Sequence, residues 1–195
     1  MMLKFLFAGL FVVFTFNQAA FAQTKATAGS VVFWTELRKL CGKAYAGTVA
    51  AAPADDVTFK DKELVMHVRA CEKNQMRIPF FVGTDKSRTW VLTRKKERIM
   101  LKHDHRHEDG TPDKVTMYGG WTTNGGLPTR QMFPADQETV DVLPAAAPNV
   151  WWIELVPGEY FTYNLRRMGS ERFFSIKFDL KKEVKTPEAP WGWKE

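Results

Sequence analysis

The stretch VWWIELVPGEYFTYNLRRMGSERFFSIKFDL, residues 150–180, contains three short segments in which bulky apolar residues alternate with polar ones. Such alternation is typical of a β-strand with one buried face, because successive side chains point to opposite sides of a sheet. The turn-forming pairs Pro157-Gly158 and Gly169-Ser170 separate the segments. Strands joined by turns this short pair in the antiparallel direction. We therefore expect three consecutive antiparallel strands, at residues 150–156, 160–165 and 173–180.

The same alternation continues upstream of this stretch, beginning at Tyr45. Turn signals such as Asp109-Gly110 and Asn124-Gly125 separate the segments, and no helical crossover lies between them. Successive strands should therefore be neighbours in an up-and-down meander. The further strands that we expect cover residues 45–50, 64–71, 76–82, 90–94, 99–105, 115–122 and 129–133, and residues 136–143 form a helical turn or an irregular segment.

An antiparallel sheet with this many strands must hide its edges. It does so either by closing into a barrel or by folding into two packed layers. We predict a mainly β protein: an antiparallel up-and-down, calycin-like β-barrel with a short N-terminal helix. A two-layer sandwich is the alternative.

The N-terminal helix is predicted at residues 30–41. Ser30 is a favourable N-cap, and Gly42 is a natural stop after the last turn. Between them, apolar residues recur on one face at helical spacing. These are Phe33, Leu37, Leu40 and Cys41. A helix this short depends on packing against the rest of the fold for its stability.

Residues 1–22 have the features of a secretory signal peptide. Lys4 supplies a positive start, residues 5–16 are apolar, and Ala20-Phe21-Ala22 is an A-x-A cleavage site that leaves Gln23 as the mature N-terminus. The apolar run is too short for a comfortable membrane span. We expect a bacterial periplasmic or secreted protein that is not an integral membrane protein after cleavage.

The mature chain is expected to form one domain. Residues 23–29 are small and polar and read as a flexible leader, and residues 30–184 form the single β-barrel domain. Residues 185–195 are a tail rich in proline and tryptophan, in which we expect Trp191 and Trp193 to cap the fold.

The charge pattern argues against nucleic acid as a partner. The formal net charge of the 195-residue chain is +6, and basic residues alternate with acidic ones, as in the run from Lys60 to Glu63. Interleaving of this kind is typical of a solvated surface, whereas a nucleic-acid interface concentrates its lysines and arginines in one stripe.

The chain has two cysteines, Cys41 and Cys71. In an exported protein, an even number of cysteines most simply forms disulfides, and two cysteines allow one intramolecular pairing. A reactive or redox pair is disfavoured because the spacing is not C-x-x-C. We expect a structural disulfide that contributes roughly 3 kcal/mol.

The sequence KHDHRHEDG, residues 102–110, concentrates three of the four histidines of the chain. If the strand that enters this motif continues unbroken, His103, His105 and His107 share the inward face of Ile99 and Leu101. They would then lie at the mouth of the barrel.

A metal site is one interpretation of this motif. Residues two apart on a strand are about 6.5–7 Å apart, so adjacent histidines can converge on one ion, whereas the outer two, about 13 Å apart, rarely do. His103 and His105 would need a further ligand, such as His67, Glu108 or Asp109. The predicted metal ligands are His103, His105, His107 and Glu108, and imidazole with carboxylate suits Zn²⁺, Cu²⁺, Ni²⁺ or Fe²⁺.

Two other interpretations stay open for the same motif. It can be a charged rim in which Arg106 pairs locally with Asp104 or Glu108, and such exposed pairs contribute little stability. It can also be a pH-sensitive mouth, because clustered histidines repel one another once they are protonated near pH 6.

A cavity for a small molecule is the other candidate site. Aromatic residues such as Trp90 and Tyr163 lie at alternating strand positions and are expected to fill the interior or to line a cavity within it. If Arg69 points inward, it could bind an acidic head group there. The predicted ligand-binding residues are Arg69, Trp90 and Tyr163.

Three stretches, KHDHRHEDGTPDKVTMYGG, RQMFPADQET and NLRRMGSERFFSIKFDLKKEV, resemble a family of uncharacterised bacterial exported proteins. This resemblance covers nearly the whole mature chain and implies export, but no activity or cofactor. The hairpin from Tyr160 to Leu180 is similar in style to the last strands of lipocalin and fatty-acid-binding barrels, although Gly42-Lys43-Ala44 stands where lipocalins have G-x-W.

Taken together, the sequence favours a non-enzymatic exported protein whose barrel holds a small apolar or weakly acidic ligand. No serine lies in a G-x-S-x-G setting, and no glycine-rich phosphate loop is present. The first alternative is a metal-binding or metal-dependent protein that uses the histidine strand. The second is an interaction module of the cell envelope that uses the charged rim or the tail with Trp191 and Trp193.

Overall fold

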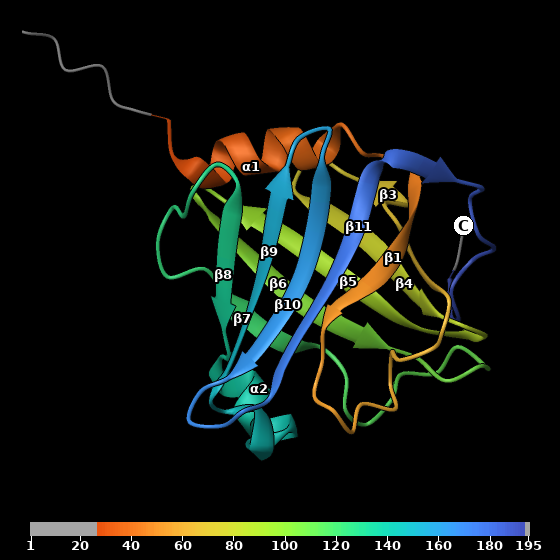
Figure 1. The fold of residues 1–195 in the computed structure, drawn as a ribbon. Coiled ribbons are helices and arrows are strands. Elements are labelled where there is room, and N and C mark those ends of the chain that lie inside the picture. Colours follow the sequence, from red (N-terminus) through yellow and green to blue (C-terminus); the bar gives the residue numbers. More distant parts are fainter. Residues whose placement is uncertain (1–26, 194–195) are drawn as a thin grey trace, which may run out of the picture.

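A computed structural model describes residues 27–193. The chain forms a long, curved antiparallel sheet, and the two α-helices lie at opposite ends of its strands (Figure 1). The elements, in chain order, are α1 (Gly29–Arg38), β1 (Ala44–Ala51), β2 (Leu64–His67), β3 (Ala70–Cys71), β4 (Gln75–Val82), β5 (Asp85–Lys95), β6 (Arg98–His105), β7 (Tyr118–Trp121), β8 (Arg130–Pro134), α2 (Gln137–Val142), the 3₁₀ turn η1 (Pro144–Ala146), β9 (Asn149–Val156), β10 (Tyr160–Arg167) and β11 (Phe173–Val184). Neither α-helix in this part of the chain is long and apolar enough to cross a membrane.

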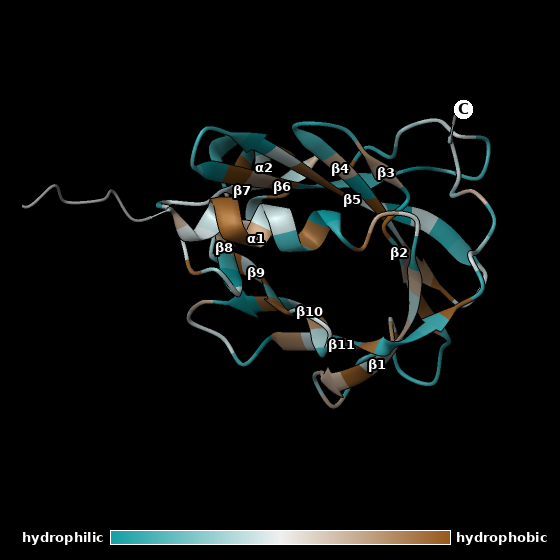
Figure 2. Ribbon diagram, turned by 90° about the horizontal axis from the view of Figure 1, so that it is seen from above, coloured by the Kyte–Doolittle hydropathy of each residue, from teal (hydrophilic) through white to brown (hydrophobic). Residues whose placement is uncertain are grey.

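The sheet has eleven strands, and almost every strand pairs with its neighbours in sequence. The order is β7-β6-β5-β4-β2-β1-β11-β10-β9-β8, and the short β3 pairs with β4 beside this path. Because β1 also pairs with β11, the first and last strands are joined and the meander wraps around on itself. This nearly closed barrel confirms the predicted fold class, and Figure 2 shows the ring of strands from above.

The two edge strands, β7 and β8, meet at a seam that closes through the backbone. The amide of Asp136, just after β8, donates a hydrogen bond to the carbonyl of Gly119 in β7, with an N–O distance of 2.9 Å. A Cβ atom at Gly120 would lie 1.9 Å from the carbonyl oxygen of Pro134, so only glycine allows this approach. The hydroxyl of Thr139 in α2 also bonds to both the amide and the carbonyl of Gly119. The seam therefore depends on glycine and on α2.

Helix α1 covers one end of the barrel (Figures 1 and 2). Phe33, Trp34 and Leu37 point into the core and are at most 1% exposed. The predicted helix is confirmed, but its expected N-cap is not: the helix begins at Gly29, and the Ser30 hydroxyl instead donates to the carbonyl of Glu97 at 2.6 Å. The Ser30 hydroxyl thus bonds to the turn between β5 and β6 instead of capping its own helix.

Cys41, just after α1, forms the predicted disulfide with Cys71 in β3. This bond ties the end of the helix to the barrel wall. Structural disulfides persist in oxidising compartments outside the cytoplasm, so the bond indicates an extracytoplasmic protein. The predicted signal peptide lies outside the described residues.

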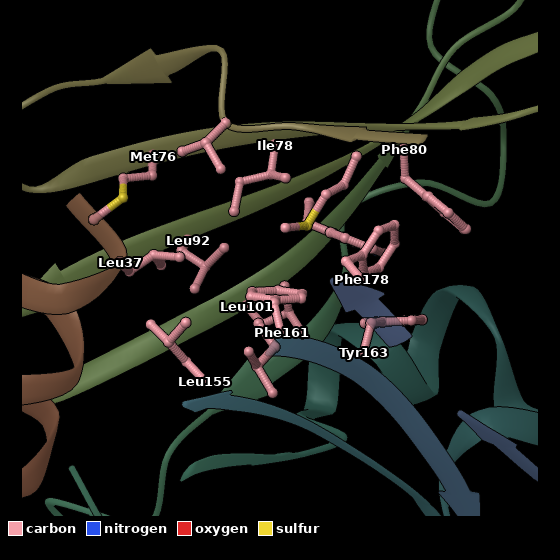
Figure 3. Close-up of a cluster of buried hydrophobic side chains, with 14 of the residues drawn as sticks. Leu37, Met76, Ile78, Phe80, Leu92, Leu101, Leu155, Phe161, Tyr163 and Phe178 are labelled. Atoms are coloured by element: carbon pink, nitrogen blue, oxygen red, sulfur yellow. The ribbon is translucent and has the colours of Figure 1, made fainter. Parts of the chain in front are cut away.

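Side chains fill most of the barrel between α1 and its far end (Figure 3). The residues drawn there come from the helix and from strands on all sides of the ring. Those labelled are Leu37, Met76, Ile78, Phe80, Leu92, Leu101, Leu155, Phe161, Tyr163 and Phe178. The interior is thus a packed core rather than a long channel, so a ligand site inside the barrel can lie only at the end that α1 does not cover.

Candidate ligand-binding site at the open end of the barrel

Two adjoining cavities lie at the end of the barrel opposite α1. Their volumes are about 60 Å³ and about 220 Å³. The smaller cavity is the deeper one, because the buried side chains of Trp90 and His103 line it. Both cavities are lined by Phe59, Arg88, His105, Tyr118 and Tyr163. They therefore form one pocket with an inner and an outer part.

The walls of this pocket come from elements far apart in the sequence. Strands β5, β6 and β7 supply one side, β9, β10 and β11 supply the other, and the loop between β1 and β2 covers part of the opening. The outer cavity is further lined by Thr58, Leu143, Asn149, Trp151, Leu165, Arg167, Arg172 and Phe174. The pocket is thus predominantly aromatic at its walls and basic at its rim.

His103 lies at the inner end and is 3% exposed. Its Nδ1 atom is 2.9 Å from the carbonyl oxygen of Tyr118, and its Nε2 atom is 2.7 Å from the hydroxyl of Tyr163. Since a carbonyl only accepts, Nδ1 carries the hydrogen and Nε2 accepts a hydrogen bond from Tyr163. Burial lowers the pKa of His103 to about 3, so this imidazole is neutral at physiological pH.

A second pair of the same kind lies nearer the opening. The hydroxyl of Tyr118 is 3.0 Å from Nε2 of His105. Burial, and then the positive charge of Arg88, lower the pKa of His105. Burial raises the pKa of Tyr118 to about 12 and also raises that of Tyr163. His103, Tyr118 and Tyr163 in the inner part of the pocket are therefore polar but uncharged, and Arg88 is the charged residue that also lines this part.

Three arginines line the pocket toward its rim. Arg88 forms an ion pair with Asp85. Arg167 donates from Nε to the side-chain oxygen of Asn149 at 3.0 Å, and the guanidinium of Arg172 lies 4.8 Å from the ring centre of Phe174. Within residues 27–193, neither Arg167 nor Arg172 has a carboxylate within 4.0 Å. No carboxylate of the described residues therefore neutralises these two positive charges at the rim.

The loop of residues 52–63 lies over part of the pocket. Asp56 is 7% exposed, and its carboxylate accepts hydrogen bonds from the backbone amides of Thr58, Phe59 and Lys60. This turn directs the ring of Phe59 toward the interior, where it lies 5.8 Å from Phe80 and 5.4 Å from Phe174. Phe59 thus forms an aromatic wall that a loop, and not a strand, holds in place.

The structure separates the three histidines of the predicted metal site. His103 and His105 point inward, as the alternation predicted, but β6 ends at His105. The chain then turns through Asp109 and Gly110, which leaves His107 and Glu108 exposed. In the described part of the chain, no three His, Cys, Asp or Glu side chains are placed to hold a metal ion. The contacts of His103 and His105 with tyrosines give the metal interpretation no support.

Trp90 and Tyr163, predicted as ligand-binding residues, do lie together on the pocket wall. Their rings stack with a centre-to-centre distance of 4.4 Å and an interplanar angle of 25°. Arg69 does not join them. It follows β2 outside the pocket, and its guanidinium lies 5.0 Å from the ring centre of Trp193. The arginines that reach the pocket are instead Arg88, Arg167 and Arg172.

The C-terminal tail provides the contact that Arg69 makes outside the pocket. The amide of Trp191 donates to the carbonyl of Lys86 at 3.1 Å, and Glu188 forms an ion pair with Lys86 at 2.7 Å. Trp193 then lies against Arg69 on the outer side of the barrel. The tail therefore packs against the fold, away from the pocket.

Sequence reasoning missed most of the rim. One signal was present: in β10, the residues Phe161, Tyr163, Leu165 and Arg167 alternate onto the same inward face, so Arg167 could have been placed beside Tyr163. Arg172 and Phe59 lie in turns or loops, where no periodicity indicates direction. Their positions come from the fold alone.

In comparisons with known proteins, no protein family, no curated protein and no solved structure matches the chain. The resemblance to uncharacterised bacterial exported proteins and to calycin barrels stays a prediction.

Proposed function

We propose that this protein is an exported, non-enzymatic binding protein that holds a small acidic ligand in the pocket at the open end of the barrel. The observation that carries the proposal is the pair Arg167 and Arg172, which lie at the rim of an aromatic cavity without a carboxylate partner in residues 27–193. Guanidinium groups bind carboxylates through paired, charge-assisted hydrogen bonds. An acidic ligand would supply the negative charge that the described residues do not place there.

The protonation states of the pocket favour binding over acid–base catalysis. An effective general acid or base has a pKa near the working pH. His103, with a pKa of about 3, and Tyr118, with a pKa of about 12, are far from neutrality. Both ring nitrogens of His103 are also occupied by hydrogen bonds to Tyr118 and Tyr163. These groups orient a ligand better than they transfer its protons.

Export to the periplasm or the medium is part of the same proposal. It is supported by the predicted signal peptide and by the disulfide between Cys41 and Cys71. A protein outside the cytoplasm meets ligands directly from the environment or from the cell envelope, which suits a capture or carrier role.

Calorimetric titration of the purified protein tests the proposal. Hexanoate and benzoate should bind, whereas benzyl alcohol, which lacks the charge, should bind at least about tenfold more weakly, since hydrogen bonds to charged groups contribute about 1.5–3 kcal/mol. The Arg167→Ala/Arg172→Ala double variant should lose this preference. Arg166→Ala is the matched control, because Arg166 is on the same strand but faces outward against Phe173. Equal affinities for acids and alcohol in the wild type would rule the proposal out.

The same rim substitutions should leave the fold intact. Arg172→Ala should change the free energy of unfolding by less than about 0.5 kcal/mol, because Arg172 is exposed and makes no ion pair with a described carboxylate. Arg167→Ala should cost about 1 kcal/mol, because it removes the hydrogen bond to the buried side chain of Asn149. Urea denaturation, followed by tryptophan fluorescence, measures this. A loss of several kcal/mol would mean that the arginines are structural rather than held ready for a ligand.

A further inference from the structure

Resting on the proposed function, we infer that the ligand is a single-ring aromatic acid with one carboxylate and an uncharged polar substituent, such as a hydroxyl group, at its opposite end. The inference comes from the size of the pocket, the shape of its walls and the difference in charge between its rim and its inner end. Each of these excludes a different class of small acid.

The size of the pocket excludes long-chain fatty acids. The outer cavity has a volume of about 220 Å³, below the roughly 300–1,000 Å³ of sites for drug-sized ligands. Beyond the inner cavity, the barrel is occupied by Leu101, Phe161 and Phe178, all at 0% exposure (Figure 3). An alkyl chain could extend inward only by displacing this core, which is destabilising because close-packed side chains are forced out of their favoured conformations.

The walls favour a flat ring over a flexible or puckered ligand. The rings of Phe59 and Phe174 meet edge to face at 87°, and those of Tyr118 and Trp151 lie 5.9 Å apart. These four aromatic rings come from a loop and three strands around the same outer cavity. An aromatic ligand gains edge-to-face or offset-stacked contacts with such walls, beyond the area that it buries.

The rim and the inner end differ in charge, which sets the orientation of the ligand. The guanidinium groups of Arg167 and Arg172, which have no carboxylate partner in the described residues, receive the carboxylate at the rim. The inner cavity, about 60 Å³, is lined by aromatic rings such as that of Trp90 and by neutral polar groups that include the Tyr163 hydroxyl and the uncharged ring of His103. Arg88, which reaches both cavities, is already paired with Asp85.

This inner end has room for one small group, since about 30 Å³ accommodates a water molecule. A hydroxyl group fits and can hydrogen-bond to Tyr163. A second carboxylate would be buried without a free positive charge beside it, which is strongly unfavourable. The pocket therefore selects a monocarboxylate over a dicarboxylate of the same length.

Isothermal titration with four matched acids tests the inference. The probes are 4-hydroxybenzoate, benzoate, the non-planar cyclohexanecarboxylate and the dianionic terephthalate. We expect 4-hydroxybenzoate to bind about fivefold more tightly than benzoate, and benzoate about fivefold more tightly than cyclohexanecarboxylate. Terephthalate should bind at least about tenfold more weakly than 4-hydroxybenzoate.

Tyr163→Phe tests the inner end separately. It should abolish the preference for 4-hydroxybenzoate over benzoate, while retained benzoate binding shows that the pocket is still folded. Tyr160→Phe is the matched control, because Tyr160 is on the same strand but its hydroxyl bonds to Glu154 on the outer face. This control should keep the preference.

The outcomes separate this inference from the proposed function. Binding of every acid with equal affinity, or tighter binding of cyclohexanecarboxylate or terephthalate, would overturn the ligand class but leave an acid-binding pocket. A hydroxyl preference that survives in Tyr163→Phe would overturn the assigned orientation. No binding of any acid, hexanoate included, would overturn both.

Discussion

The two ends of the barrel are built from the same meander but contain opposite kinds of residue. At the end covered by α1, Phe33, Trp34 and Leu37 enter an apolar core, and a disulfide ties the helix to β3. At the open end, the strands contribute His103, Tyr118 and a rim of arginines around a cavity. The closed end buries mainly apolar surface, whereas the open end combines aromatic walls with buried polar groups that must each find a partner.

The difference shows how a small barrel divides stability from recognition. At the closed end, apolar burial and the disulfide stabilise the fold, and neither requires a polar group in the interior. The open end keeps hydrogen-bonded but uncharged groups inside and charged groups at its rim, an arrangement that contributes less stability and leaves space for a ligand. Substitutions at the two ends should therefore have different effects on unfolding and on binding.

The largest expected effect is at the closed end. Phe33→Ala should lower the free energy of unfolding by about 3–5 kcal/mol, because it removes a fully buried ring from a packed core. Phe59→Ala at the open end removes a half-buried ring and should cost less than about 2 kcal/mol. Urea denaturation of both variants with the disulfide intact measures the contrast. Equal losses would break the distinction between the two ends.

The disulfide is next. Cys41→Ser/Cys71→Ser should cost about 3 kcal/mol, since the bond closes a loop with a sequence separation of 30 residues. Acid binding by the folded variant at the open end should be unchanged. Denaturation of the wild type with and without reductant gives an independent value, and an unchanged midpoint would show that the bond adds no stability.

Acidification should act in large part through His103 at the open end, and His67, which is buried outside the pocket and has a pKa lowered by burial, adds to the same effect. The pKa of His103 is about 3 in the folded protein, below its ordinary value of 6.5. The unfolded chain therefore binds a proton first, so the stability from the neutral histidine is complete above pH 6.5 and is lost as the pH falls toward 3. We expect a loss of about 2 kcal/mol between pH 7 and pH 5.

His103→Gln keeps a hydrogen-bonding group but cannot titrate, so it should remove much of this pH dependence. His105, whose pKa is also lowered by burial, contributes in the same direction. His107→Gln is the control, because His107 is exposed. Urea denaturation at several pH values makes the comparison, and a His103→Gln variant as sensitive to acid as the wild type would contradict the assignment.

The histidine motif illustrates how far the sequence reaches into the site. Alternation along β6 correctly places His103 and His105 on the inward face. The alternation does not predict the position of His107, because side chains alternate between two faces only within a strand. The strand β6 ends at His105, and the chain then turns at Gly110. Arg69 does not reach the pocket for a related reason. It lies at a break between β2 and β3, where strand alternation no longer indicates which way a side chain points.

By itself, the sequence determined the antiparallel meander, the short N-terminal helix and the pairing of Cys41 with Cys71, because alternation, turn residues and cysteine number are local or countable properties. The tertiary structure decided which residues surround the pocket. Phe59, Tyr118 and Arg172 are far apart along the chain, and their meeting depends on how the ring closes through β1 and β11. Closure is a property of the whole sheet, so no single strand encodes it.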